Sequence, residues 1–158
     1  MKTTLFIALL LTAGTASAAT MPTSHAHATS KTLIAKQFDI WNSALKTGNP
    51  EKVAALYCQP GGVLLPTVSN QVRSTHSEIV DYFEHFLKSK PVGHIDKSFI
   101  RILGHNAAIN SGIYTFHLVQ NDKPVTVQAR YTFVYERRHG SWCIMDHHSS
   151  AMPESMTK

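Results

Sequence analysis

Apolar residues recur with a helical period in the first part of the chain. Across Ile34–Leu45 they fall at steps of four and three residues, the stripe of an amphipathic helix that Gly48 is placed to end. Asn49-Pro50-Glu51 supplies a cap, a proline and an acid in the order that opens a second, short helix. Thr75-His76-Ser77-Glu78 is a capping-box pattern, and it predicts a third helix from about Ser77 to Ser89.

The pattern then changes to that of strands. Four later segments are rich in β-branched and aromatic residues and are separated by turn residues: His94–Leu103, Ala107–Val119, Val125–Arg138 and Trp142–Ser150. A short apolar strand, Val63–Pro66, is predicted before the third helix. Helices followed by a meander of long strands indicate an α+β fold, with three N-terminal helices packed in the concave side of a curved antiparallel sheet.

The first residues resemble a secretory signal. Lys2 is followed by an apolar run from Leu5 to Leu11 and a small-residue cleavage site, Ala16-Ser17-Ala18, within a chain of 158 residues. We therefore expect a signal peptide at 1–18 and a periplasmic or secreted protein with no membrane span after cleavage. A flexible leader at 19–30, one domain at 31–153 and a C-terminal tail at 154–158 complete the predicted organisation.

Charge and cysteine content narrow the class of protein. The formal net charge of +5 comes from scattered lysines and arginines, whereas a nucleic-acid binder clusters them, so no nucleic-acid partner is expected. Cys58 and Cys143 would enter an oxidising compartment, where a disulfide is permitted. Two separate buried thiols are the alternative, because the distance between them cannot be taken from the sequence.

The last predicted strand ends in a run of titratable and hydroxyl groups. Strict alternation along that strand puts Trp142, Ile144, Asp146, His148 and Ser150 on one face and Cys143, Met145, His147 and Ser149 on the other. Adjacent residues on opposite faces do not share a metal ion, so no metal site is predicted. A Ser-His-Asp hydrolase site is also disfavoured, because the chain has no Gly-x-Ser-x-Gly elbow.

A pocket lined by aromatic and a few polar groups is the favoured candidate site. Its predicted ligand-binding residues are Trp41, Tyr57, Tyr82, Tyr114 and Arg130. Arg130 would hold an anion, and His148 would donate or titrate near neutral pH. The alternative is structural: the aromatic residues would form the core, and Arg130 would serve a salt bridge across a dimer interface.

Several motifs resemble the NTF2-like superfamily, and more closely its bacterial SgcJ/EcaC and SnoaL-like branch, which is similar to the association (hub) domain of calcium/calmodulin-dependent protein kinase II. The motifs lie in order from about Lys31 to Pro153: Trp41-Asn42-x-Ala44-Leu45, Gly48-Asn49-Pro50, Val63-Leu64-Leu65-Pro66-Thr67, Tyr82-Phe83-x-x-Phe86-Leu87, Ala129-Arg130-Tyr131-Thr132-Phe133-Val134-Tyr135, Gly140-Ser141-Trp142-Cys143-Ile144 and His147-His148-Ser149-Ser150-x-Met152-Pro153.

The resemblance implies a cone with a pocket at its wide end, and a homodimer or larger ring. In the kinase hub, arginines of the middle strands line the pocket. The matching places here are Tyr114 and Phe133, and Arg130 points to the other side unless a bulge shifts the register. The chain has no kinase motif, neither a Gly-rich loop nor His-Arg-Asp nor Asp-Phe-Gly, so kinase activity is not implied.

Two functions follow as hypotheses, and neither requires a cofactor. The first is an exported module that self-associates and holds a small polar or aromatic ligand. The second is an isomerase, cyclase or dehydratase in which the catalytic acid/base is His148 or Asp146 and Arg130 stabilises an oxyanion. The second requires Arg130 and His148 to lie inside the pocket.

Overall fold

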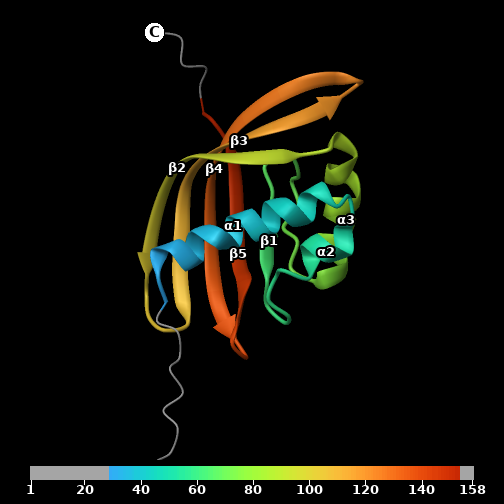
Figure 1. Ribbon diagram of the computed structural model, residues 1–158. Coiled ribbons are helices and arrows are strands. Elements are labelled where there is room, and N and C mark those ends of the chain that lie inside the picture. Colours follow the sequence, from blue (N-terminus) through green and yellow to red (C-terminus); the bar gives the residue numbers. More distant parts are fainter. Residues whose placement is uncertain (1–28, 154–158) are drawn as a thin grey trace, which may run out of the picture.

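The computed structural model describes residues 29–153, which fold into helices followed by a curved sheet (Figure 1). The predicted signal peptide at 1–18, most of the predicted leader and the tail at 154–158 lie outside the described residues. No helix between residues 29 and 153 is long and apolar enough to cross a lipid bilayer.

The helices form where the capping residues and the apolar stripe predict them. They are α1 (Lys31–Lys46), α2 (Pro50–Ala54), α3 (His76–Phe86) and a final 3-10 turn, η1 (Leu87–Ser89). The side chains of Ser30 and Asn49 cap the first two helices, and Thr75 and Glu78 complete a capping box on the third. The predicted stripe of α1 is buried in full: Ile34, Phe38, Trp41 and Leu45.

The five strands form one open sheet in the order β1-β5-β4-β3-β2. Their bounds are β1 (Val63–Leu65), β2 (Val92–Ile102), β3 (Ala107–Gln120), β4 (Lys123–Arg138) and β5 (Ser141–Ala151). The four long strands pair antiparallel as predicted. The short β1 instead runs parallel to β5, pairing Leu64 with His147, so the complete sheet is mixed.

The sheet has two chemically different faces. We call inner the face that carries Tyr131, Phe133 and Tyr135 of β4, all of them buried. Helix α1 crosses this face (Figure 1), and the rings of Phe38 and Phe133 lie 6.3 Å apart. The outer face carries the alternate residues of β4, among them Arg130.

A β-bulge changes the alternation that the sequence predicts for β5. Val134 pairs with Asp146 and Tyr135 pairs with Ile144, so Met145 is an extra residue without a partner. The predicted grouping of Ile144 with Asp146 is therefore wrong. Ile144 shares the inner face with His147 and Ser149, since these three pair with the buried tyrosines and phenylalanine of β4.

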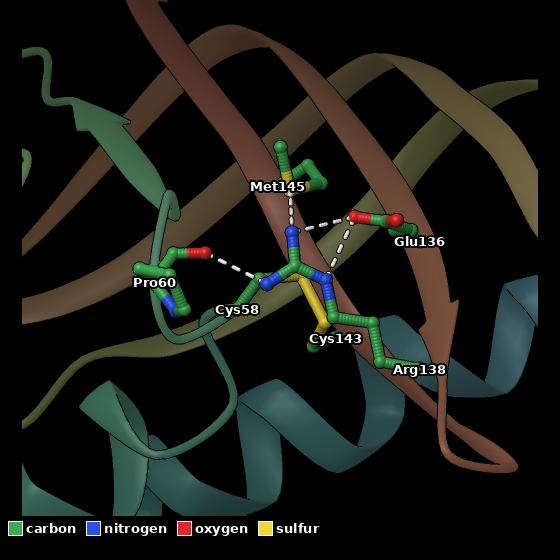
Figure 2. The surroundings of a disulfide bond; sticks show 6 residues. All are labelled: Cys58, Pro60, Glu136, Arg138, Cys143 and Met145. Carbon is green, nitrogen blue, oxygen red and sulfur yellow. Dashed lines mark hydrogen bonds and ion pairs between the residues drawn. A yellow bond between two sulfur atoms is a disulfide. The ribbon is translucent and has the colours of Figure 1, made fainter.

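Two sets of contacts fasten the loop after α2 to the end of the sheet (Figure 2). Cys58 and Cys143 form a disulfide with their Cα atoms 4.9 Å apart, so the two cysteines are not separate thiols. The Arg138 guanidinium donates to the carbonyl of Pro60 at 2.7 Å and to the Met145 sulfur at 3.1 Å. It also pairs with Glu136 at 2.7 Å. These contacts hold Cys58, the residue after Tyr57, against β5, the strand that carries His147.

Candidate functional site

A cavity of about 80 Å³ lies between the helices and the inner face of the sheet. It is several times the roughly 10–15 Å³ that one water molecule requires, so it has room for more than one water-sized group. Within residues 29–153, no Asp, Glu, Lys or Arg lines it. The lining is mainly aromatic and aliphatic with a few neutral polar groups: Trp41, Leu64, Pro66, Thr67, Val68, Tyr82, Phe83, Phe86, Tyr114, Phe116, Leu118, Gln120, Val127, Ala129, His147 and Ser149.

His147 is the one titratable imidazole of this lining, and its surroundings keep it neutral. The side chain is buried, with its ring stacked on Phe133 at 4.0 Å and edge-on to Trp41 at 5.2 Å. Burial lowers the pKa of His147 to about 3, and the nearby charge of His148 adds to the effect. The ring is therefore uncharged throughout the physiological range of pH.

Tyr57 supports the His147 ring from behind the cavity wall. Its hydroxyl lies 2.9 Å from Nδ1 of His147. Complete burial raises the pKa of Tyr57 well above its ordinary value, so the hydroxyl keeps its proton. The indole N–H of Trp41 lies close enough to the Tyr57 oxygen to oppose part of that rise in pKa, although the geometry falls short of a good hydrogen bond.

A second polar group of the lining consists of three hydroxyls. Tyr114 donates to Oγ of Ser149 at 2.5 Å, and Ser149 in turn shares a hydrogen bond with Oγ1 of Thr67. Burial raises the pKa of Tyr114, and the hydrogen bond that Tyr114 donates to Ser149 offsets part of the rise. All three groups are neutral at physiological pH, so the cavity offers hydrogen bonds without charge.

The cavity continues into an open groove of about 470 Å³. The two share five lining residues: Val68, Tyr82, Phe86, Leu118 and Gln120. Charge first appears in this groove, where Arg73 and Asp81 form an ion pair at 2.6 Å. Arg73 is held there by a pair of backbone hydrogen bonds to Leu64. The groove is thus the side on which the cavity opens.

The structure brings four of the predicted ligand-binding aromatics to this site. Trp41, Tyr82 and Tyr114 line the cavity directly. Tyr57 lies one layer behind it and acts on the lining through His147. The sequence left open whether these aromatic residues line a pocket or form the core. Trp41, Tyr82 and Tyr114 do both, because they pack in the core and also form the wall of the cavity.

The other predicted residues lie on the outer face. Arg130 pairs with Ser150, and His148 pairs with Thr132, at an open depression of about 280 Å³ on the surface away from the cavity. Arg130 donates to the carbonyl of Ala151 at 3.3 Å.

Asp146 also lies on the outer face, because it pairs with the outer-face residue Val134 of β4. Partial burial raises the pKa of Asp146, and His148 opposes that rise. The predicted placement of Arg130 and His148 inside the pocket is wrong, because the alternation of β4 and β5 turns both side chains outward. Asp146 is absent from the cavity lining as well.

The sequence interpretation missed His147, Ser149 and Thr67 as site residues. The available signal was cross-strand pairing: Phe133 opposes His147 and Tyr131 opposes Ser149, so the aromatic face of β4 identifies the inner face of β5. The register that makes this connection depends on the bulge at Met145. Thr67 reaches Ser149 from the loop after β1. The two residues are 82 positions apart in the sequence, and periodicity gives no signal for so distant a contact.

Comparisons with known proteins agree with this architecture. The family model described as the calcium/calmodulin dependent protein kinase II association domain matches residues 30–153. A search of curated proteins found no match. A crystal structure of a candidate association domain of this kind from Xanthomonas campestris is 52% identical, covers 87% of this chain and 95% of its own, and has a TM-score of 0.78.

Two more distant structures share the fold. The association domain of the C. elegans kinase is 14% identical, with coverage of 77% of this chain and 95% of its own and a TM-score of 0.62. A candidate dehydratase of the NTF2-like family from Streptomyces avermitilis is 13% identical, with coverage of 77% and 95% and a TM-score of 0.67. At these identities the likeness extends to the fold alone.

Proposed function

We propose that the chain is a self-associating module that binds a small neutral molecule in its cavity. The chain belongs to the calcium/calmodulin-dependent protein kinase II association-domain family and has the NTF2-like fold. The observation that carries the ligand-binding part is the cavity of about 80 Å³, to which the described residues contribute aromatic rings and neutral hydrogen-bonding groups but no charged side chain. Pockets of this composition suit uncharged organic ligands.

Acid–base catalysis is the weaker alternative because the groups in the cavity do not titrate near neutral pH. An efficient general acid or base has a pKa close to the working pH. Burial instead lowers the pKa of His147 to about 3 and raises the pKa values of Tyr82 and Tyr114 above their ordinary range. The predicted isomerase, cyclase or dehydratase would also need Arg130 and His148 in the cavity, and both lie on the outer face. We propose no kinase activity, since the matched family model describes an association domain.

A cavity-filling variant tests the binding proposal. Ala129 is a buried residue of the lining, and Ala129→Leu would fill space that a ligand needs. Toluene serves as a small neutral probe, and NMR titration of labelled protein measures its binding. We expect saturable binding to the wild type and none to Ala129→Leu, with Thr132→Ala on the outer face as the matched control. Equal binding to wild type and Ala129→Leu, or no binding to either, would overturn the proposal.

Self-association is proposed to use the outer face of the sheet. This face has an apolar strip formed by Phe99, Ile109, Ile113 and Val134, and Phe99 is 54% exposed. Ile109, Ile113 and Val134 are only partly exposed, and a second copy of the chain could cover them together with Phe99. Light scattering after size exclusion should give a homodimer or larger ring for the wild type and a smaller species for Val134→Glu. A monomeric wild type would contradict this part of the proposal.

Export to the periplasm or the medium is also a proposal. A disulfide between Cys58 and Cys143 persists in oxidising compartments, and the signal-like pattern of residues 1–18 is consistent with such a destination. Mass spectrometry of the protein from its native host should find a mature chain that begins at residue 19. Intact protein that retains Met1–Ala18 in the cytoplasm would contradict it.

A further inference from the structure

The neutral polar groups of the cavity wall contain more hydrogen-bond donors than they can satisfy among themselves. The first such group is the pair formed by Tyr57 and His147. Neutral His147 carries one N–H proton and Tyr57 carries one O–H proton, yet a single hydrogen bond joins the two side chains. One donor of this buried pair is therefore left over, whichever ring nitrogen holds the proton.

The surroundings of the pair favour Nε2 of His147 as the leftover donor. If Tyr57 donates to Nδ1, its oxygen stays free to accept from the nearby Trp41 indole, which has no other hydrogen-bond partner within residues 29–153. The opposite arrangement would leave the Tyr57 proton unused and would require the Tyr57 oxygen to accept from both His147 and Trp41, and buried donors are rarely left unused. Nε2 of His147 likewise has no partner in the described part of the chain.

The second group is the hydroxyl chain of Tyr114, Ser149 and Thr67. Three hydroxyls carry three protons, and two hydrogen bonds connect them. Tyr114 donates to Ser149, so the bond between Ser149 and Thr67 uses one of the two remaining protons and leaves the other free. Both Ser149 and Thr67 line the cavity, which places the free proton at its wall.

From these two counts we propose that the cavity selects neutral molecules that carry a hydrogen-bond-accepting oxygen, above all aryl ketones and related carbonyl compounds. This inference rests on the proposed function and names the class of ligand. A carbonyl oxygen accepts a proton from the wall without bringing one of its own. Leaving a buried donor unpaired costs more free energy than leaving a lone pair unused. An acceptor in the ligand therefore adds more to the binding affinity than a donor does.

The spacing of the two groups limits the ligand further. His147 and Ser149 are two residues apart on the inner side of β5, a separation of roughly 6–7 Å along a strand. A ligand with one carbonyl would satisfy the hydroxyl group of Ser149 and Thr67 at the wall. Nε2 of His147 is itself buried, so a second carbonyl oxygen would reach it only if the ring turned toward the ligand.

Matched probes test the proposal on the intact protein. Acetophenone and ethylbenzene share a ring and nearly the same size, and they differ in the carbonyl oxygen. We expect NMR or calorimetric titration to give a Kd for acetophenone roughly two- to tenfold lower than that for ethylbenzene, as one net hydrogen bond provides.

Two sets of substitutions should remove this preference. Thr67→Val keeps the shape of the side chain and deletes its hydroxyl. Tyr57→Phe with His147→Phe removes both partners of the other pair, and the Trp41 indole N–H is then the buried group that loses its nearby acceptor. The ratio of the two Kd values should fall toward one in at least one of these variants and reach one when they are combined. Ser150→Ala on the outer face is the control and should keep the wild-type ratio.

The outcomes separate this inference from the proposed function. Equal affinity of wild type for both probes, or a preference that persists in the combined variant, would overturn the carbonyl selectivity while leaving a binding cavity. Binding of neither probe would overturn the cavity proposal and this inference with it. Thr67→Val alone keeps the test decisive if the double phenylalanine variant does not fold, which circular dichroism would detect.

Discussion

His147 and His148 are neighbours in the chain, and the two faces of the sheet give them opposite properties. His147 is 3% exposed, stacked on Phe133 and held neutral, with a pKa of about 3. His148 is exposed beside Arg130 and Asp146, the only charged groups that the sequence suggested for chemistry. The inner face thus has a recessed cavity lined by neutral groups of the described residues, and the outer face has charge on an open surface. Residue type alone does not say which face can hold a ligand.

The largest expected difference between the faces is in packing. Phe133 is fully buried against Trp41 and His147, so Phe133→Ala should lower the free energy of unfolding by about 3–5 kcal/mol. Its neighbour Thr132 lies on the outer face, and Thr132→Ala should change it by less than about 1 kcal/mol. Urea denaturation of the two variants measures both values. Similar losses would mean that the two faces are not distinguished by burial.

The disulfide is the second largest test, because it joins the residue after Tyr57 to the strand that carries His147. Replacing both Cys58 and Cys143 with Ala should cost about 2–4 kcal/mol, as is usual for a cross-link that closes a long loop. The Arg138 contacts to Pro60 and Met145 remain and should keep the variant folded. Thermal unfolding with and without reductant measures the effect. An unchanged melting temperature for the reduced wild type would contradict it.

The pH dependence of stability provides a third comparison. The pKa of His147 is about 3 in the folded protein and about 6.5 in an unfolded chain, so only the unfolded state binds a proton between these values. The stability contributed by the neutral ring is complete above pH 6.5 and falls by up to about 1.4 kcal/mol per unit as the pH drops toward 3.

Substitution isolates that contribution from other titrating groups. His147→Phe should flatten the profile between pH 6.5 and 4 relative to wild type, measured as urea midpoints across the range. His105→Gln, at an exposed histidine in the turn between β2 and β3, is the matched control and should follow the wild-type slope. The account fails here if the two variants change the slope equally.

The smallest predicted effect concerns the hydroxyl group of Tyr114. Tyr114→Phe removes the donor to Ser149 but keeps the ring in the aromatic core, and the expected loss of stability is about 0.5–1.5 kcal/mol. Tyr131→Phe is the comparison on the same face. The Tyr131 hydroxyl donates to Asn110 at 3.0 Å, and Tyr131 does not line the cavity. Acetophenone binding should change only for Tyr114→Phe, as NMR titration would measure.

Local patterns were sufficient to predict the elements of the fold. The stripe from Ile34 to Leu45, the capping box at Thr75 and the strand segments all formed close to their expected bounds, because capping and periodicity act over a few residues. The parallel pairing of β1 with β5 was not predicted, since short strands carry no signal for their partner.

The candidate site could be predicted only in part for the same physical reason. Aromatic residues on the helices and on β3, such as Trp41 and Tyr114, were identified because their periodicity marks a buried face. His147 and Ser149 were not, since the bulge at Met145 sets the phase of β5 and arises from pairing with a distant strand. The disulfide and the contact of Thr67 with Ser149 likewise join segments more than eighty residues apart.

The most direct test of the account is a titration of isotopically labelled protein with acetophenone, followed by the NMR signals of both faces. The account predicts saturable shifts at His147 and Ser149 on the inner face, including the ring nitrogens of His147, and unchanged signals at Arg130 and His148. Shifts confined to Arg130 and His148, or no saturable shift at all, would contradict the assignment of the binding site to the neutral cavity.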